Sequence, residues 1–195
     1  KTFGNNVRAL ATGNKKRRLI RYQVITEVGI KTGDKVLDVG CGLAKYYEYL
    51  NNRGIKVKYT GIDISEDLIR ESKKKYPKIK FYVRDLEVFP FRKNSFDYAI
   101  ASQVFNHKLK SKTNLNLSKR MIKIMYNISR KGVAIDFLTK YVDYRERKHF
   151  HYSPEELFSF VKKISNRVLV RHDYPLYEFC MYIYPSFKNW KKYEK

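Results

Sequence analysis

Cysteine, tryptophan and proline are scarce in this 195-residue chain, which has two, one and five of them. No apolar run approaches the roughly 20 residues that a membrane-spanning helix needs, so no membrane association is expected. Cys41 and Cys180 lack the partner spacing of a metal site, so no metal is predicted, and they fit reduced thiols. Together with the absence of a signal-peptide pattern, this favours a cytoplasmic location.

Acidic residues are also few, with 19 Asp and Glu against 42 Lys and Arg, which gives a formal net charge of +23. Such a balance can indicate a nucleic-acid partner. The lysines, however, are scattered over the whole chain, and the wealth of Lys, Asn, Ile and Tyr is typical of an AT-rich genome. A phosphorylated or otherwise anionic small substrate would use the same charge with fewer contacts.

The most informative segment that is present is an apolar strand that runs into a glycine turn, residues 36–44, VLDVGCGLA. Gly40 and Gly42 allow a tight turn and a close approach to a ligand, and such corners bind nucleoside cofactors at the carboxyl ends of parallel strands. A dinucleotide fingerprint needs a third glycine where Lys45 stands, so a pyrophosphate is not indicated. Asp38 instead suits a cofactor with a cationic part, such as S-adenosylmethionine.

Residues 38–44, DVGCGLA, resemble motif I (D/E-x-G-x-G-x-G) of the class I, Rossmann-like S-adenosylmethionine-dependent methyltransferases. Ala44 replaces the last glycine, and we expect little effect because Ala44 would lie in the first turn of the following helix. The resemblance covers nearly the whole chain, which is similar to the small, generic methyltransferase-domain group. It implies that Gly40, Cys41 and Gly42 contact the cofactor, whose product is S-adenosylhomocysteine.

Two further strand ends carry an acid. Asp63 lies about 20 residues after the glycine turn, the offset at which an acid can reach a ribose. In the family, the acid that ends the second strand accepts hydrogen bonds from the ribose hydroxyls, and Asp63 matches it, with Ile64 beside it in the cofactor site. Asp85 matches the acid that binds the adenine amino group, and Leu86 the residue that packs beside the ring. The alternative for Asp63 is a plain turn or cap.

The fourth strand, residues 95–102, is similar to the "fDvv" strand of the family. Asp97 lies at its start, far from the carboxyl end, and is assigned a structural role. Ser102 and Gln103 emerge at the ligand end and are expected to line the cofactor pocket. The chain lacks the N/D-P-P-Y/F/W loop that base-amino methyltransferases carry at this point, since residues 102–105 read SQVF.

Hydrophobic periodicity and turn signals predict an α/β fold. Strands are expected over 35–39, 57–62, 79–83, 95–102, 132–137, 167–172 and 178–184, and helices over 16–30, 43–53, 65–75, 117–128 and 153–164. By the resemblance, they form a doubly wound, seven-stranded, mostly parallel sheet in the order 3-2-1-4-5-7-6, with the last strand antiparallel and helices on both faces. One domain over residues 1–195 is expected, with a loose segment over 1–15 and a basic tail over 185–195.

Arg21 lies on the predicted N-terminal helix, which covers the cofactor in proteins of this kind. An arginine there can grip the methionine carboxylate of the cofactor with two hydrogen bonds. The alternative is a solvated basic helix face that Arg21 shares with Arg17 and Arg18.

The resemblance implies methyl transfer to a small, possibly anionic, metabolite or glycan precursor. A hydroxyl acceptor usually needs a general base, and His107, just after the fourth strand, is the best-placed candidate. Three other histidines are alternatives: His149, His151 and His172. Three tyrosines of the insertion before the last predicted helix are candidates for the wall of the acceptor site: Tyr141, Tyr144 and Tyr152.

Two other functions remain open beside this one. One is an RNA or DNA methyltransferase that uses its basic surface. The other is a pseudo-enzyme subunit that binds the cofactor and activates a catalytic partner. The sequence does not fix the oligomeric state or the atom that is methylated.

Overall fold

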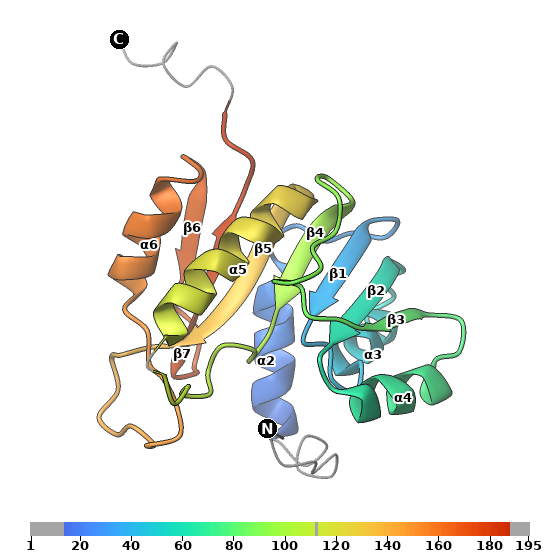
Figure 1. Cartoon of the computed structure of the whole chain (residues 1–195), viewed down its shortest axis with the longest axis horizontal. Helices are drawn as coiled ribbons and strands as arrows, with labels where there is room; N and C mark the ends of the chain where they lie inside the picture. The colour runs from blue at the N-terminus through green and yellow to red at the C-terminus, as the bar shows by residue number, and fades with distance from the viewer. Residues whose placement is uncertain (1–13, 112, 188–195) are drawn as a thin grey trace.

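The computed structural model describes residues 14–111 and 113–187. Within them, one seven-stranded sheet has the order β3-β2-β1-β4-β5-β7-β6 (Figure 1). The strands are β1 (Lys35–Val39), β2 (Lys58–Asp63), β3 (Lys80–Val83), β4 (Phe96–Ala101), β5 (Ser129–Leu138), β6 (Val168–Arg171) and β7 (Glu178–Ile183). The helices are α2 (Lys15–Thr26), α3 (Lys45–Asn52), α4 (Glu66–Lys75), α5 (Asn114–Ile128) and α6 (Pro154–Lys162).

The strand order and directions confirm the predicted fold. Strands β1 to β5 pair in parallel, whereas β7 runs antiparallel to both β5 and β6. The carboxyl ends of β1, β2, β4 and β5 therefore meet at one edge of the sheet, which is where open α/β sheets bind ligands. That edge carries the glycine turn after β1.

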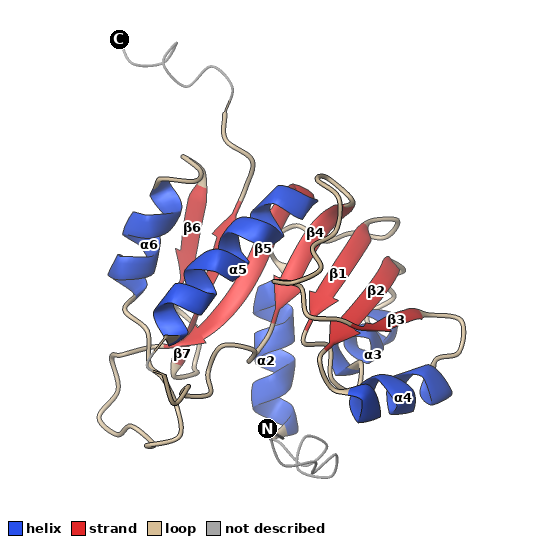
Figure 2. Ribbon diagram, viewed as in Figure 1, coloured by secondary structure: helices blue, strands red, loops and turns tan. Residues whose placement is uncertain are grey.

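Helices cover both faces of the sheet, as Figure 2 shows. Helices α5 and α6 contact β4, β5 and β6 on one face, and α2 and α4 contact β5, β2 and β3 on the other. Each face has its own apolar cluster: Leu37 of β1 belongs to the cluster under α5 and α6, and its neighbour Val36 belongs to the opposite cluster. This alternation follows from the two-residue period of a strand.

Local sequence signals explain where most helices begin. The side chain of Ser65 caps α4 by accepting from the Leu68 N–H, and that of Ser153 caps α6 by accepting from the Glu156 N–H. Helix α5 begins at Asn114, three residues before the predicted start. There the buried Asn114 amide donates to the His107 carbonyl and accepts from the Leu109 N–H, which anchors the first turn.

Other element boundaries also differ from the predictions. Helix α2 ends at Thr26 instead of at residue 30, and β5 begins at Ser129 instead of at residue 132. Most of the predicted loose segment 1–15 and of the basic tail 185–195 lies outside the described residues. No helix within the described residues is long and apolar enough to cross a membrane.

The connection between β3 and β4, residues 84–95, contains no helix. A doubly wound sheet normally has a helix in such a crossover, so part of one sheet face beside β1, β2 and β3 stays uncovered (Figure 2). The exposure along β3 reflects this, because Phe81 is its one buried residue.

Candidate active site

The glycine turn after β1 is shaped by two residues with positive φ. Gly40 has φ +70° and Gly42 has φ +51°. A Cβ on Gly40 would lie 2.6 Å from Cγ2 of Val104, whereas a Cβ on Gly42 would meet no atom within 4 Å. Gly42 therefore borders open space at the carboxyl edge, and this is the kind of backbone that a ligand can approach closely.

Ala44 does not lie where the sequence predicts. It is not in the first turn of α3 but is the residue before it, with φ +55° in the left-handed region. An L-residue pays roughly 1–2 kcal/mol for this conformation, so the replacement of the family glycine is a strained one. The methyl group of Ala44 is fully buried, which offsets part of that cost.

Asp63, at the end of β2, fastens the glycine turn to the start of α4. One carboxylate oxygen accepts from the Gly42 N–H at 3.0 Å, and the other accepts from the Ser65 N–H at 3.0 Å. Ser72 of α4 adds a second link, because its hydroxyl donates to the Gly42 carbonyl at 2.8 Å. Each carboxylate oxygen keeps acceptor capacity, and the half-buried side chain lies at the ligand edge.

Asp38 is a buried carboxylate of β1 that accepts a hydrogen bond from the Tyr59 hydroxyl. Burial raises the pKa of Asp38 to about 7; the Tyr59 hydrogen bond opposes this rise, and the nearby charges of Asp63 and Asp136 add to it. No cation of the described residues forms a salt bridge with Asp38. A buried carboxylate without a counter-ion favours either a proton or a cationic ligand.

A second buried acid, Asp136 of β5, was missed by the sequence analysis. It is fully buried and accepts hydrogen bonds from the Ser102 hydroxyl at 2.8 Å and from the Gln103 N–H at 2.7 Å. Burial and the charge of Glu178 raise the pKa of Asp136 to about 7, while Arg21 lowers it. The signal that would have found it is the rule used for Asp63, an acid near the carboxyl end of an apolar strand.

Arg21 of α2 has a different partner from the expected one. Its Nε and one terminal nitrogen donate to the two carboxylate oxygens of Glu178 at 2.7 and 2.6 Å, and Nε lies 3.6 Å from Asp136. Glu178 therefore occupies the Nε edge of the guanidinium, and a contact of Arg21 with the methionine carboxylate stays a prediction. The geometry also rules out the solvated basic face as its environment, because its side chain is 13% exposed.

The site as a whole carries more negative than positive charge. Four acids approach one another from four strands: Asp38, Asp63, Asp136 and Glu178. The charges of Asp63 and Asp136 raise the pKa of Asp38, and the charge of Glu178 raises that of Asp136. Arg21 is the cation paired with this group among the described residues. Such a cluster suits a ligand that brings a positive charge.

The structure places the remaining predicted cofactor residues along the same edge. Ile64 follows Asp63 and is 66% exposed, which is unusual for an isoleucine beside a strand end. Asp85 is exposed and accepts from the Glu87 N–H at 2.8 Å, whereas Leu86 is buried in the core. Cys41 is a buried free thiol whose pKa is raised by burial.

The loop after β4 is joined to the insertion that follows β5. Lys108 N–H donates to the Lys148 carbonyl at 2.8 Å, Phe150 N–H donates to the Asn106 carbonyl at 2.9 Å, and His107 pairs with His149 in an isolated bridge. His107 is exposed, and its ring centre lies 5.8 Å from that of His149.

Two of the tyrosines proposed as walls of the acceptor site reach the surface. Tyr141 and Tyr144 are 57% and 78% exposed. Tyr152 is instead buried, where its hydroxyl bonds Ser118 and donates to the Phe105 carbonyl at 2.9 Å. Tyr152 is therefore a structural residue, and its assignment to the acceptor wall is wrong.

Comparison with known proteins decides the family. The family model described as "Methyltransferase domain" matches residues 36–132. The chain is also 31% identical over 154 residues to Rv1506c of Mycobacterium tuberculosis, which is named as a methyltransferase; the match covers 75% of this chain and 90% of that protein. The chain belongs to the class I S-adenosylmethionine-dependent methyltransferases.

Solved structures agree with the fold of this methyltransferase. A SAM-dependent methyltransferase from Aquifex aeolicus superposes with a TM-score of 0.63 at 20% identity, over 92% of this chain and 98% of that one. Magnesium protoporphyrin IX methyltransferase from Synechocystis, crystallised with S-adenosylhomocysteine, gives 0.65 at 16% identity, over 94% and 91%. A second structure of the Synechocystis enzyme was crystallised with S-adenosylmethionine and superposes with a TM-score of 0.62.

Proposed function

We propose that the methyltransferase transfers a methyl group to a small, anionic metabolite or glycan precursor that lies between the loop after β4 and the insertion after β5. The observation that carries this proposal is the surface of the insertion, where exposed aromatic rings stand beside exposed cations. Tyr141 and Tyr144 are exposed, as are Arg145, Arg147 and Lys148. Rings of this kind pack on a substrate, and the cations attract its negative charge.

We assign the cofactor to the carboxyl edge from the chemistry of the acids there. Asp63 is positioned to accept from the ribose hydroxyls while it holds the Gly42 and Ser65 amides. Asp38 supplies the negative charge for the ammonium group of the methionine part, because it is buried without a counter-ion. The open space at Gly42 admits the adenosyl group beside the turn of Gly40, Cys41 and Gly42.

The adenine end is assigned to the segments after β2 and β3. Asp85 is exposed at this edge and offers an acceptor to the adenine amino group, and the exposed Ile64 offers an apolar surface to the ring. Leu86 supports the pocket from the core. Ser102 and Gln103, held by Asp136, close the side of the pocket that faces the acceptor.

The chemistry then depends on alignment and on exclusion of water. When bound, S-adenosylmethionine supplies a methyl group on a sulfonium, and the acceptor must attack in line with it. Rigid placement of both reactants contributes roughly 7–11 kcal/mol through effective concentration. Ser102 and Gln103, fixed by Asp136, give the pocket this rigidity, and His107 at the acceptor side accepts the proton when the acceptor is a hydroxyl.

Calorimetry with S-adenosylhomocysteine, followed by a product-release assay over pooled small metabolites, tests this function. We expect cofactor binding and turnover with an anionic metabolite pool. Binding without turnover on any pool, nucleic acids included, would favour the pseudo-enzyme alternative. Turnover on RNA or DNA alone would favour the nucleic-acid alternative.

The pH dependence of cofactor binding provides a further prediction. The pKa of Asp38 is about 7 in the folded protein against an ordinary 3.8, so the folded state holds this proton more tightly, and its contribution to stability is lost as pH rises from about 4 to 7. Binding of an ammonium group needs the carboxylate, so S-adenosylhomocysteine should bind more weakly below pH 7, by up to about tenfold per pH unit. Calorimetry between pH 5.5 and 8 measures this.

The matched variant for this prediction is Asp38→Asn, which keeps the shape of the side chain. We expect it to bind S-adenosylhomocysteine more weakly at pH 8 and to have a flatter pH profile. An unchanged slope in this variant would show that another group, such as Asp136, is the one that titrates.

His107→Ala is expected to lower turnover by about 10²- to 10⁴-fold when the acceptor is a hydroxyl, the usual contribution of a general base. Because His107 does not lie among the cofactor residues, the affinity for S-adenosylhomocysteine should stay the same. Product formation under single-turnover conditions measures the loss of turnover, and calorimetry measures the affinity for S-adenosylhomocysteine. His172→Ala tests one of the alternative bases in the same way, and unaltered turnover in His107→Ala would exclude His107 as the base.

We also propose that the methyltransferase works in the cytoplasm, with both of its cysteines as reduced thiols. Cys41 and Cys180 are both free and buried in the structure, which suits a reducing compartment.

A further inference from the structure

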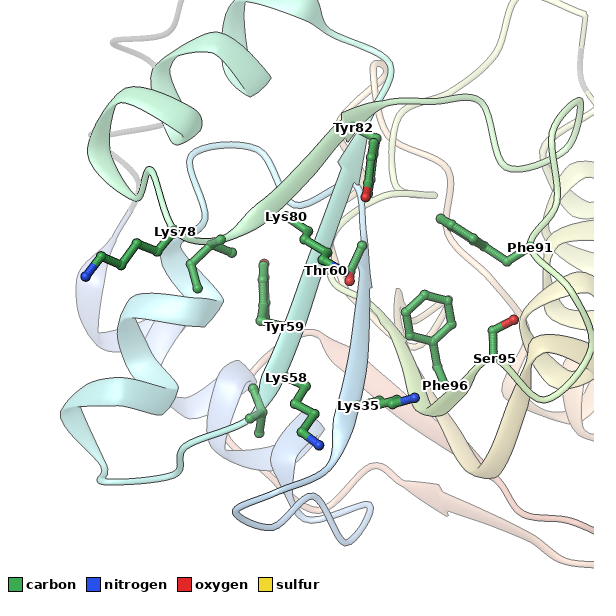
Figure 3. Close-up of a pocket in the computed structure, with 12 residues that line it drawn as sticks. Lys35, Lys58, Tyr59, Thr60, Lys78, Lys80, Tyr82, Phe91, Ser95 and Phe96 are labelled. Atoms are coloured by element: carbon green, nitrogen blue, oxygen red, sulfur yellow. The ribbon is translucent and has the colours of Figure 1, made fainter.

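A groove of about 490 Å³ lies on the part of the sheet that no helix covers, and Figure 3 shows the side chains that line it. It is built from the first residues of β1, β2 and β4, from β3 and the residues before it, and from the connection between β3 and β4. None of the residues assigned to the cofactor lines this groove. The groove therefore shares no residue with the proposed cofactor site, although Tyr82 lies opposite Ile62, one residue before Asp63, and so reaches toward the carboxyl ends of the strands.

The composition of the groove follows from the sheet. Lys58 and Thr60 of β2 lie on the same face because side chains alternate along a strand, and Lys80 and Tyr82 of β3 lie on that face too. In a covered sheet these positions would be apolar. Here they are polar or aromatic, and three of them, Lys58, Lys80 and Tyr82, are exposed, whereas Thr60 is buried.

Four lysines line the groove: Lys35, Lys58, Lys78 and Lys80, of which Lys78 points away from Tyr82 and Phe91 (Figure 3). No aspartate or glutamate lines it, and no ion pair within the described residues neutralises these four ammonium groups. Lys35 and Lys58 are register partners on adjacent strands, so both side chains start on the same face of the sheet. Elsewhere on this protein many lysines are paired with acids, for example Lys75 with Glu48 and Lys119 with Glu156.

Aromatic rings accompany these charges. Tyr82 is 43% exposed on the sheet, and Phe91 lies on the other side of the groove, on the connection (Figure 3). Phe91 is held in place by the Arg84 guanidinium, 4.2 Å from its ring centre, and by an edge-to-face contact with Phe96. The exposed ring of Tyr82 is then a platform on which a flat ligand ring can stack.

We propose that this groove binds single-stranded nucleic acid, with a base stacked on Tyr82 and the phosphates on the row of lysines. Proteins that hold single strands combine a basic groove with aromatic platforms in this manner. The charge complementarity favours this ligand over an acidic protein segment, because carboxylates alone would leave the Tyr82 platform without a flat partner. The proposal goes beyond the methyl-transfer function and stands whichever acceptor the active site takes.

Fluorescence anisotropy with a labelled 12-nucleotide oligouridine RNA, and with an abasic strand of the same length, tests the proposal. Tyr82→Ala is expected to weaken RNA binding at least about fivefold, the loss of one stacked base, and to leave binding of the abasic strand unchanged. Tyr82→Phe keeps the ring and should restore RNA affinity. S-adenosylhomocysteine binding, measured on each variant, reports that the fold is intact.

Charge is tested by Lys80→Gln against Lys163→Gln, an exposed lysine beyond the end of α6. For a single strand, loss of one phosphate contact lowers the slope of log affinity against log salt by about 0.7. We expect that change for Lys80→Gln and none for Lys163→Gln.

Equal losses in both lysine variants, together with an unchanged affinity in Tyr82→Ala, would overturn the proposal and show diffuse attraction by the net charge. The proposal would also be overturned if a free mononucleotide bound as tightly as the 12-nucleotide RNA. Failure of RNA binding while S-adenosylhomocysteine still binds would remove this proposal and leave the proposed methyl-transfer function standing.

Discussion

Asp63→Ala is expected to weaken binding of S-adenosylhomocysteine by about 2–4 kcal/mol, because two charge-assisted hydrogen bonds to the ribose are lost. This corresponds to a dissociation constant higher by roughly 30- to 1,000-fold. The structure adds a second reason for a large effect. Asp63 also accepts from the Gly42 and Ser65 amides, so its removal loosens the turn that the cofactor contacts.

Two variants separate these contributions. Asp63→Asn keeps one acceptor oxygen and should lose less affinity than Asp63→Ala. Asp67→Ala removes an acid from the first turn of α4, where Asp67 pairs with Arg70 on the surface, and should leave affinity unchanged. Calorimetry at pH 8 measures all three. Wild-type affinity in Asp63→Ala would mean that other residues hold the ribose.

Arg21→Met is expected to lower the free energy of unfolding by about 3–5 kcal/mol, the usual effect of removing one partner of a buried ion pair. Arg21 forms two hydrogen bonds with Glu178 and is the nearest cation to Asp136. Without it, two buried carboxylates face each other with no counter-ion. Urea denaturation at pH 8 measures the loss.

The pH profile of this variant has a definite sign. Burial and Glu178 already raise the pKa of Asp136 to about 7, and removal of the Arg21 charge raises it further. A raised pKa in the folded state means that stability is lost as pH increases, so the deficit of Arg21→Met should be larger at pH 8 than at pH 5.5.

Arg17→Met, on the exposed side of the same helix, is the control and should change stability little. Glu178→Gln added to Arg21→Met should recover part of the loss, because it removes one of the two unpaired charges. A stability loss that is the same at both pH values would contradict this account of the pair.

The sequence predicted those parts of the fold and site that depend on local order. A strand followed by an acid or a glycine turn places Asp38, Gly42 and Asp63 at one edge whatever the rest of the chain does, and the parallel register of β1 with β2 brings these ends together. The strand order, which was predicted from the family resemblance, is confirmed as well. The roles of these residues toward the cofactor remain proposals.

Side-chain contacts between distant strands were not predicted. Glu178 approaches Asp136 and Arg21 only because β7 pairs antiparallel with β5, so that Leu138 lies opposite Glu178 and Asp136 lies opposite Cys180. No signal near Arg21 in the sequence identifies that partner. The left-handed conformation of Ala44 was missed because Ala44 was placed in the first turn of the following helix, although the family motif has a glycine at this position.

The exposed groove was also invisible in the sequence. The alternation of Lys58 with Tyr59 and of Lys80 with Phe81 is an ordinary pattern for a strand with one solvated face. It becomes informative only once the connection over residues 84–95 is seen to lack a helix.

The central claim is that the carboxyl edge of the sheet holds the adenosyl cofactor through carboxylates. A crystal structure of the protein with S-adenosylhomocysteine tests it most directly. We predict ribose hydroxyls within hydrogen-bond distance of Asp63, the adenosyl group beside Gly42, and the ammonium group on the side of Asp38. A ligand that binds elsewhere, or that lies at this edge with Asp38 and Asp63 turned away from it, would contradict the claim.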